Sequence, residues 1–136
     1  MLRLFFVLIS LLPLLRATDS SLSIVHIQSF EYPYLAHLAN EEGNVEIILF
    51  VGRDGAVRST KVVSGNRLLA DGAAKALTSW KFSPCNKPDG NCEYPMSIRF
   101  SLSGEPIVIS ECKTEFQFDN PGRIVITSRR ALAIKD

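Results

Sequence analysis

The stretch NVEIILFVGRDGAVRSTKVVS, residues 44–64, decides the fold. Apolar side chains occupy every second position of its first part: Val45, Ile47, Leu49 and Val51. A period of two is typical of a strand that buries one face. The dipeptide Asp54-Gly55 follows, and Asp-Gly is a strong signal for a hairpin turn. Residues 56–64 then return as a second strand, so the stretch predicts an antiparallel hairpin.

A helix is predicted on each side of this hairpin. Downstream, residues 68–81 carry one apolar stripe at helical spacing, made of Leu69, Ala73, Ala76, Leu77 and Trp80. Pro84 prevents the helix from continuing. Upstream, Tyr32-Pro33 opens a short helix, because proline suits the first helical position, and Gly43 can end it.

A third strand is predicted over residues 94–102, where two faces alternate. Met96, Ile98, Phe100 and Leu102 form the apolar face, and Ser97, Arg99 and Ser101 form the polar one. This alternation is typical of an antiparallel strand with one wet face. Residues 104–136 form an extension, in which residues 114–127 predict another hairpin. We therefore expect an α+β fold of two layers, a three-stranded antiparallel sheet with two helices on one face, plus a C-terminal β-hairpin.

The first 17 residues, MLRLFFVLISLLPLLRA, have the pattern of a secretory signal peptide. Arg3 precedes an apolar run of 12 residues, which is short of the roughly 20 that a membrane-spanning helix needs. We expect residues 1–17 to be removed, residues 18–29 to form an N-terminal segment, and residues 30–103 to form the main domain. The alternative is an uncleaved leader that anchors the protein.

Export would place Cys85, Cys92 and Cys112 in an oxidising compartment, where disulfides persist. Cys85 and Cys92 flank the turn-rich segment NKPDGN, so we predict a bridge between them, with pairings of Cys112 as the alternatives. The remaining thiol is then either free or joins two chains, which leaves a homodimer open. A zinc site using these cysteines with His26 or His37 is a further alternative, although the spacing matches no compact ligand motif. We expect no metal.

Composition and motifs argue against several function classes. The 136 residues are 46% hydrophobic and 21% charged, as in one ordinary packed domain. The net charge of +1 gives no electrostatic case for nucleic acid. His26 and His37 stand in no nucleophile or zinc motif, and Cys85 and Cys92 are not C-x-x-C. We expect no enzyme, no catalytic residue, no cofactor and no small-molecule substrate.

Six pieces of the sequence, in this order, resemble the C-terminal domain of TonB-family proteins. They are Tyr32-Pro33, Gly43-x-Val45, Asp54-Gly55 with Val57, Val62-Val63-Ser64-Gly65, residues 69–74, and Trp80-Lys81-Phe82-Ser83-Pro84. The resemblance covers residues 30–102. Most of these residues are expected to serve the fold, with Trp80 and Phe82 as core anchors.

The resemblance implies a non-enzymatic binding domain that is located in the periplasm. If the leader is not cleaved, the alternative location is the inner membrane, where the leader would hold the protein. In TonB-like domains the last strand of the sheet receives an extended segment of an outer-membrane transporter by β-strand addition. Residues 94–102 match that edge strand by position. The expected contacts to an extended segment of a transporter, or of another envelope protein, are Tyr94, Met96, Ser97, Ile98, Arg99, Phe100 and Ser101.

Two departures from the family pattern set an alternative function beside this one. The short leader and the following 15 or so residues lack the membrane anchor and Pro-rich spacer of a full energy transducer. Residues 104–128 add strand-like sequence after the expected edge, and our hypothesis is that they pack near it and shield it. The alternative is therefore a secreted structural or inhibitory module with a self-capped sheet edge and no energy transduction.

Overall fold

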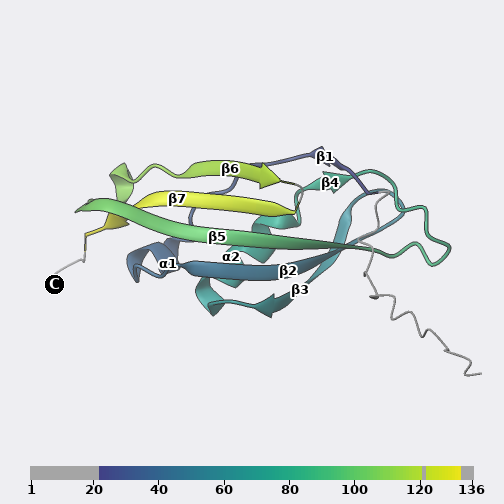
Figure 1. Cartoon of the computed structure of the whole chain (residues 1–136), viewed down its shortest axis with the longest axis horizontal. Helices are drawn as coiled ribbons and strands as arrows, with labels where there is room; N and C mark the ends of the chain where they lie inside the picture. Colours follow the sequence, from purple (N-terminus) through teal and green to yellow (C-terminus); the bar gives the residue numbers. More distant parts are fainter. Residues whose placement is uncertain (1–21, 121, 133–136) are drawn as a thin grey trace, which may run out of the picture.

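The computed structural model describes residues 22–120 and 122–132 (Figure 1). The predicted signal peptide, residues 1–17, lies outside them. Two helices, one short 3₁₀ helix and seven strands follow along the chain: β1 (Ile24–His26), α1 (Tyr34–Leu38), β2 (Gly43–Val51), β3 (Val57–Ser64), α2 (Arg67–Leu77), β4 (Lys81–Phe82), β5 (Cys92–Ile107), η1 (Ile109–Glu111), β6 (Glu115–Asn120) and β7 (Arg123–Ala131). No helix of the described part is long and apolar enough to cross a membrane.

The main sheet has five strands in the order β3-β2-β5-β7-β6. The prediction of an α+β fold with two helices is confirmed, whereas the prediction of three strands is wrong. The hairpin predicted over residues 114–127 forms as β6 and β7, but it joins the main sheet instead of standing apart from it. The reason is that Ile124 and Ile126 continue the buried apolar face of the sheet.

Strand β5 lies in the middle of this sheet, between β2 and β7 (Figure 1). It pairs antiparallel with β2, from Gly43↔Phe100 to Val51↔Cys92. On its other side it pairs with β7 in parallel, and the register there runs from Ser97↔Arg123 to Ser103↔Arg129. Strand β7, the last described strand, therefore lies between β5 and β6, although β6 directly precedes it in the chain.

Helix α2 begins close to its predicted start but ends at Leu77 instead of residue 81, because Lys81 and Phe82 pair with β1 as strand β4. It packs its apolar stripe against the sheet. Its N-cap is Asn66, whose side-chain oxygen accepts from the backbone N–H groups of Leu68 and Leu69. Trp80 is fully buried just beyond the helix, and its indole N–H donates to the carbonyl of Gln28 at 2.9 Å. This bond ties the segment after β1 to the helix layer.

Two residues of the TonB-like pattern have a packing role that the sequence did not reveal. A Cβ at Gly72 in α2 would lie 2.5 Å from Cγ of Pro33, so glycine is what allows the two helices to approach. At the hairpin turn, Gly55 has a φ of 78°, and a Cβ there would overlap the carbonyl oxygen of Phe82. The predicted bridge between Cys85 and Cys92 is confirmed, with their Cα atoms 5.8 Å apart.

Candidate functional site

The side chains of the predicted partner-binding strand divide between the core and the open face of the sheet. Met96, Ile98 and Phe100 are at most 1% exposed, so their side chains cannot meet a partner. Tyr94 is half-buried against Phe82, with ring centroids 4.9 Å apart, and this burial raises the pKa of its phenol. The side chains left for contacts are Ser97, Arg99 and Ser101, on the face that the helices do not cover.

From Ser97 onward, the backbone of this strand is occupied on both sides. The amide of Ser97 donates to the carbonyl of Gly122 at 2.7 Å, so Ser97 points its backbone groups toward β7. By the alternation of a strand, Arg99 and Ser101 point theirs the same way. The prediction that residues 94–102 form an edge is therefore wrong from Ser97 onward, where β7 pairs with the strand. The hypothesis that the C-terminal extension packs beside this strand is confirmed, whereas the shielding of the strand from a partner stays a prediction.

Strand β7 is bound into the fold by its side chains and by helix α1. Ile124 and Ile126 have no exposed surface. The ring of His37 in α1 donates from Nε2 to the carbonyl of Arg129 at 2.6 Å, because a carbonyl can only accept. Asn40, just after α1, accepts from the amide of Ala131 at 3.3 Å. These contacts make β7 a structural strand and not a loose cover.

The first part of β5, residues 92–96, extends beyond the start of β7 and has no strand partner there among the described residues. Since Ser97 points its backbone toward β7, Pro95 and Glu93 face the same side by alternation. Pro95 has no N–H to donate, and proline at such a position blocks the pairing of another strand. This uncovered part of β5 is therefore a poor site for strand addition.

Two strands of the described sheet keep a free outer side, β3 and β6. Strand β3 is eight residues long and contains no proline, so every backbone donor is present. Val62 and Val63 on it are 41% and 57% exposed. The sequence does not indicate β3 as a candidate, because the hairpin pattern of residues 44–64 predicts both strands without saying which one is outermost.

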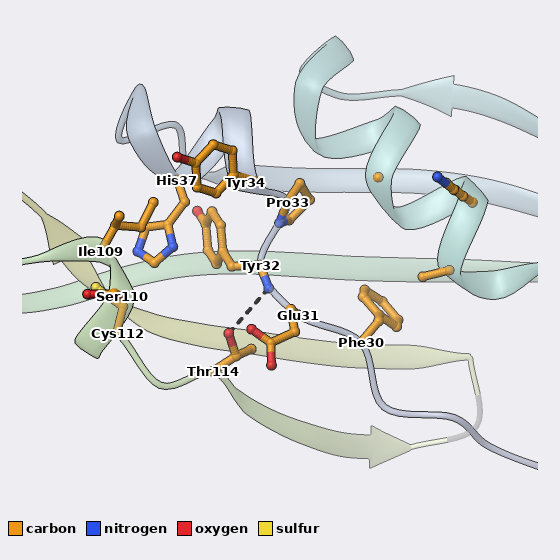
Figure 2. Close-up of a pocket in the computed structure, with 13 residues that line it drawn as sticks. Phe30, Glu31, Tyr32, Pro33, Tyr34, His37, Ile109, Ser110, Cys112 and Thr114 are labelled. Carbon is orange, nitrogen blue, oxygen red and sulfur yellow. Dashed lines mark hydrogen bonds between the residues drawn. The ribbon is translucent and has the colours of Figure 1, made fainter.

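A groove of about 870 Å³ lies on the helix side of the molecule (Figure 2). Its walls come from the segment before α1, from α1 and α2, and from the segment around η1. Tyr32 stands at its centre, donating its hydroxyl to the carbonyl of Glu41 and its amide to Oγ1 of Thr114 at 3.3 Å. Burial, with smaller contributions from Glu42 and Glu41, holds the pKa of this phenol far above its usual value.

The groove brings a histidine and a thiol together without catalytic geometry. Sγ of Cys112 lies 3.6 Å from the carbonyl of Arg129, which also accepts the proton on Nε2 of His37. An imidazole nitrogen that carries this proton cannot take one from the thiol. In the described part of the chain, no three His, Cys, Asp or Glu side chains gather as metal ligands would. The groove is therefore a concave surface with mixed polar and apolar walls, in which Nε2 of His37 is not available as a base for the thiol.

Comparison with known families decides what kind of domain this is. The family model described as the Gram-negative bacterial TonB protein C-terminal matches residues 28–102. This chain belongs to the TonB C-terminal family. Among solved structures, the solution NMR structure of the Pseudomonas aeruginosa TonB CTD is 20% identical, covers 60% of this chain and 84% of that chain, and has a TM-score of 0.43.

The family match places the molecule in a functional setting. TonB C-terminal domains are periplasmic in Gram-negative bacteria, interact with outer-membrane transporters and are not enzymes. The matched residues include β2, β3 and β5 as far as residue 102, whereas β6 and β7 lie beyond the match. The last strand of the TonB-like part is thus covered by a strand from outside it.

Proposed function

We propose that this chain is a periplasmic TonB-like domain that binds an extended segment of an envelope protein by strand addition at β3, not at β5. The observation that carries the proposal is the strand order, in which β5 has a neighbour on each side and β3 has only β2. The partner is of the kind that the family binds, a segment of an outer-membrane transporter or of another envelope protein. We also propose that residues 1–17 act as a signal peptide that directs export of the chain to the periplasm.

Binding at β5 would require β7 to leave. Full burial of one Ile side chain is worth roughly 1.5–3 kcal/mol. Exposing Ile124 and Ile126 would therefore cost about 3–6 kcal/mol before any hydrogen bond is counted. An incoming segment would have to replace this apolar contact as well as the backbone pairing. The residues Ser97, Arg99 and Ser101 are partner contacts only if that exchange takes place.

Strand β3 also offers backbone donors and acceptors to an incoming segment, and no strand has to be displaced to expose them. Its outer backbone groups face no other strand of the described sheet, and an extended peptide can add to them by main-chain hydrogen bonds. Arg58 and Lys61 are both exposed, and the strand has no acidic residue. An extended segment with acidic side chains therefore suits this edge better than a basic one.

Peptide titration against locked and charge-reversed variants tests the proposal. The probes are synthetic peptides with the sequences of segments of outer-membrane transporters from the same host, and binding is measured by calorimetry. Arg99 and Val125 are Cα partners on β5 and β7, so Arg99→Cys with Val125→Cys, in a Cys112→Ser background, locks the two strands together. We expect binding to survive this lock and to weaken in Lys61→Glu, while Lys75→Glu on helix α2 has no effect.

Each other outcome identifies a different function. Binding that is lost in the locked variant and kept in Lys61→Glu would refute the proposal, because it would show that the segment displaces β7 and uses β5. The absence of binding to any probe would favour the alternative, a structural or inhibitory module whose sheet is closed by its own chain.

A further inference from the structure

The two free edges of the five-stranded sheet carry opposite charge. Strand β3 has Arg58 and Lys61 and no acidic residue. Strand β6, at the other end of the sheet, has Glu115 and Asp119 and no basic residue. Both strands are exposed along most of their length. A single sheet therefore presents a cationic edge and an anionic edge.

The directions of the strands allow these two edges to pair between copies. Strand β5 is antiparallel to β2, as β3 is, so β3 and β5 run the same way. Strand β7 runs with β5, and β6 runs against β7. Strand β6 is therefore antiparallel to β3. A second copy placed beside the first by translation brings β6 of one against β3 of the other in antiparallel pairing, with the open faces of both sheets on the same side.

Side-chain faces also agree at this contact. Lys61 pairs with Ile48 and Gln117 pairs with Val125, and both lie on the open face. With Lys61 opposite Gln117, Glu115 is a diagonal neighbour of Lys61, and diagonal neighbours are within reach of long side chains. Asp119 lies at an irregularity of β6 and its carboxylate contacts Arg123 at 3.7 Å, so Glu115 is the principal partner for Lys61.

The same register joins apolar side chains on the helix face. Val62, which is 41% exposed, comes opposite Phe116, and Thr60 comes opposite Phe118, which is 39% exposed. Pairs of an aromatic with a β-branched residue stabilise neighbouring strands. Charge on one face and apolar contact on the other thus favour the same alignment.

We infer that copies of this chain associate head to tail, with β6 of one copy added to the β3 edge of the next. Because the contact joins two different surfaces, it is heterologous and leaves one β3 and one β6 free at the ends of an open assembly. This inference goes beyond the proposed function, since it requires β3 to be a free edge but does not require a transporter segment to bind there. Where both hold, self-association and partner binding compete for β3.

Sedimentation velocity of the full chain over a range of concentrations tests the inference. We expect the mean mass to rise with concentration and to fall at high salt, which screens exposed charges. Lys61→Glu and Glu115→Lys each replace an attraction by a repulsion, so each raises the concentration needed for association by roughly tenfold. The double variant restores association, because the two charges are exchanged. Lys75→Glu and Glu111→Lys make the same charge changes away from both edges and serve as controls.

The outcomes separate this inference from its alternatives. A chain that stays monomeric at all concentrations overturns it, and the charges then act to keep the two edges apart from other strands. If only Lys61→Glu has an effect, the contact is an isologous pairing of two β3 edges and the inference is wrong. A monomeric chain that still binds transporter peptides would leave the proposed function intact, and an associating chain that ignores them would refute only the proposed function.

Discussion

Replacing Ile126 by alanine tests whether β7 belongs to the core. Ile126 has no exposed surface, lies beside Phe100 of β5 and Phe116 of β6, and is at the centre of its strand. Ile→Ala removes three carbon groups, at about 0.8 kcal/mol each. The cavity that remains adds to this loss, since large-to-small changes of this kind cost about 2–5 kcal/mol. We expect the free energy of unfolding to fall by about 3 kcal/mol.

Urea denaturation followed by two probes measures this effect. Trp80 is the single tryptophan of the chain, and its ring lies 6.3 Å from that of Phe116. Its fluorescence therefore reports the packing of the helix layer against the sheet near β6. Far-UV circular dichroism reports the secondary structure of the whole chain. If β7 is a structural strand, both probes give one coincident transition that is shifted to lower urea.

The refuting result is a variant whose main transition does not move. In that case β7 would be a detachable flap, and hydrogen exchange would become faster only in β6, β7 and the outward amides of β5. Thr127→Ala is the matched control, because Thr127 is the next residue of the strand and faces the open side. A surface change of this kind is expected to alter stability by less than about 1 kcal/mol.

Three further changes have expected results of different kinds. Replacing Cys85 and Cys92 by serine should lower the free energy of unfolding by about 2.5 kcal/mol, the loop-closure value for an eight-residue ring, and an unchanged urea midpoint would contradict this. In Tyr32→Phe, the lost hydrogen bond to Glu41 should cost about 1 kcal/mol at neutral pH. Because burial raises the pKa of Tyr32 in the folded state, its contribution to stability is complete below the unfolded pKa of about 10 and is lost as pH rises above it. The difference between wild type and Tyr32→Phe in thermal scans should therefore shrink above pH 10, and a constant difference would refute the assignment. Asn66→Ala should cost about 1 kcal/mol by thermal unfolding and Asn66→Asp much less, since aspartate keeps the capping oxygen.

Local patterns predicted most of the TonB-like part of this fold. Residues 44–64 form the expected hairpin because alternation and the Asp-Gly turn act over short distances. Helix α2 and the buried face of β5 follow equally from the spacing of apolar residues. The bridge between Cys85 and Cys92 was favoured for the same reason, since only a short turn separates them.

The position of β7 could not be predicted in this way. Alternation at Ile124 and Ile126 predicts a strand and its hairpin with β6, but it does not say what lies on the other side of β7. The pairing of Ser97 with Arg123 is parallel and joins residues far apart in the chain, and no local signal records it. The prediction of a partner-binding edge at residues 94–102 failed for the same reason. A strand is an edge only if no other strand pairs with one of its sides, and the local sequence of β5 does not say whether β7 pairs there.

The groove around Tyr32 was also missed, for a related reason. Tyr32-Pro33 predicted a helix start, which is correct, but the opposite wall comes from Ile109 and Cys112, far along the chain. The buried phenol bonded to Glu41 and the imidazole bonded to Arg129 depend on tertiary packing. Nothing in the local sequence distinguishes such a buried ring from one on the surface.

The insertion of β7 between β5 and β6 sets an order of assembly for a chain that is made from its N-terminus. Residues up to the end of β5 can form the hairpin and helix layer first, but the side of β5 next to β7 stays unpaired until residues 123–131 have arrived. During that interval the nascent protein exposes a strand edge and an unfilled apolar surface, both of which favour aggregation. The time that passes before the last strand arrives would then affect the yield of folded protein, in addition to the stability of the finished fold.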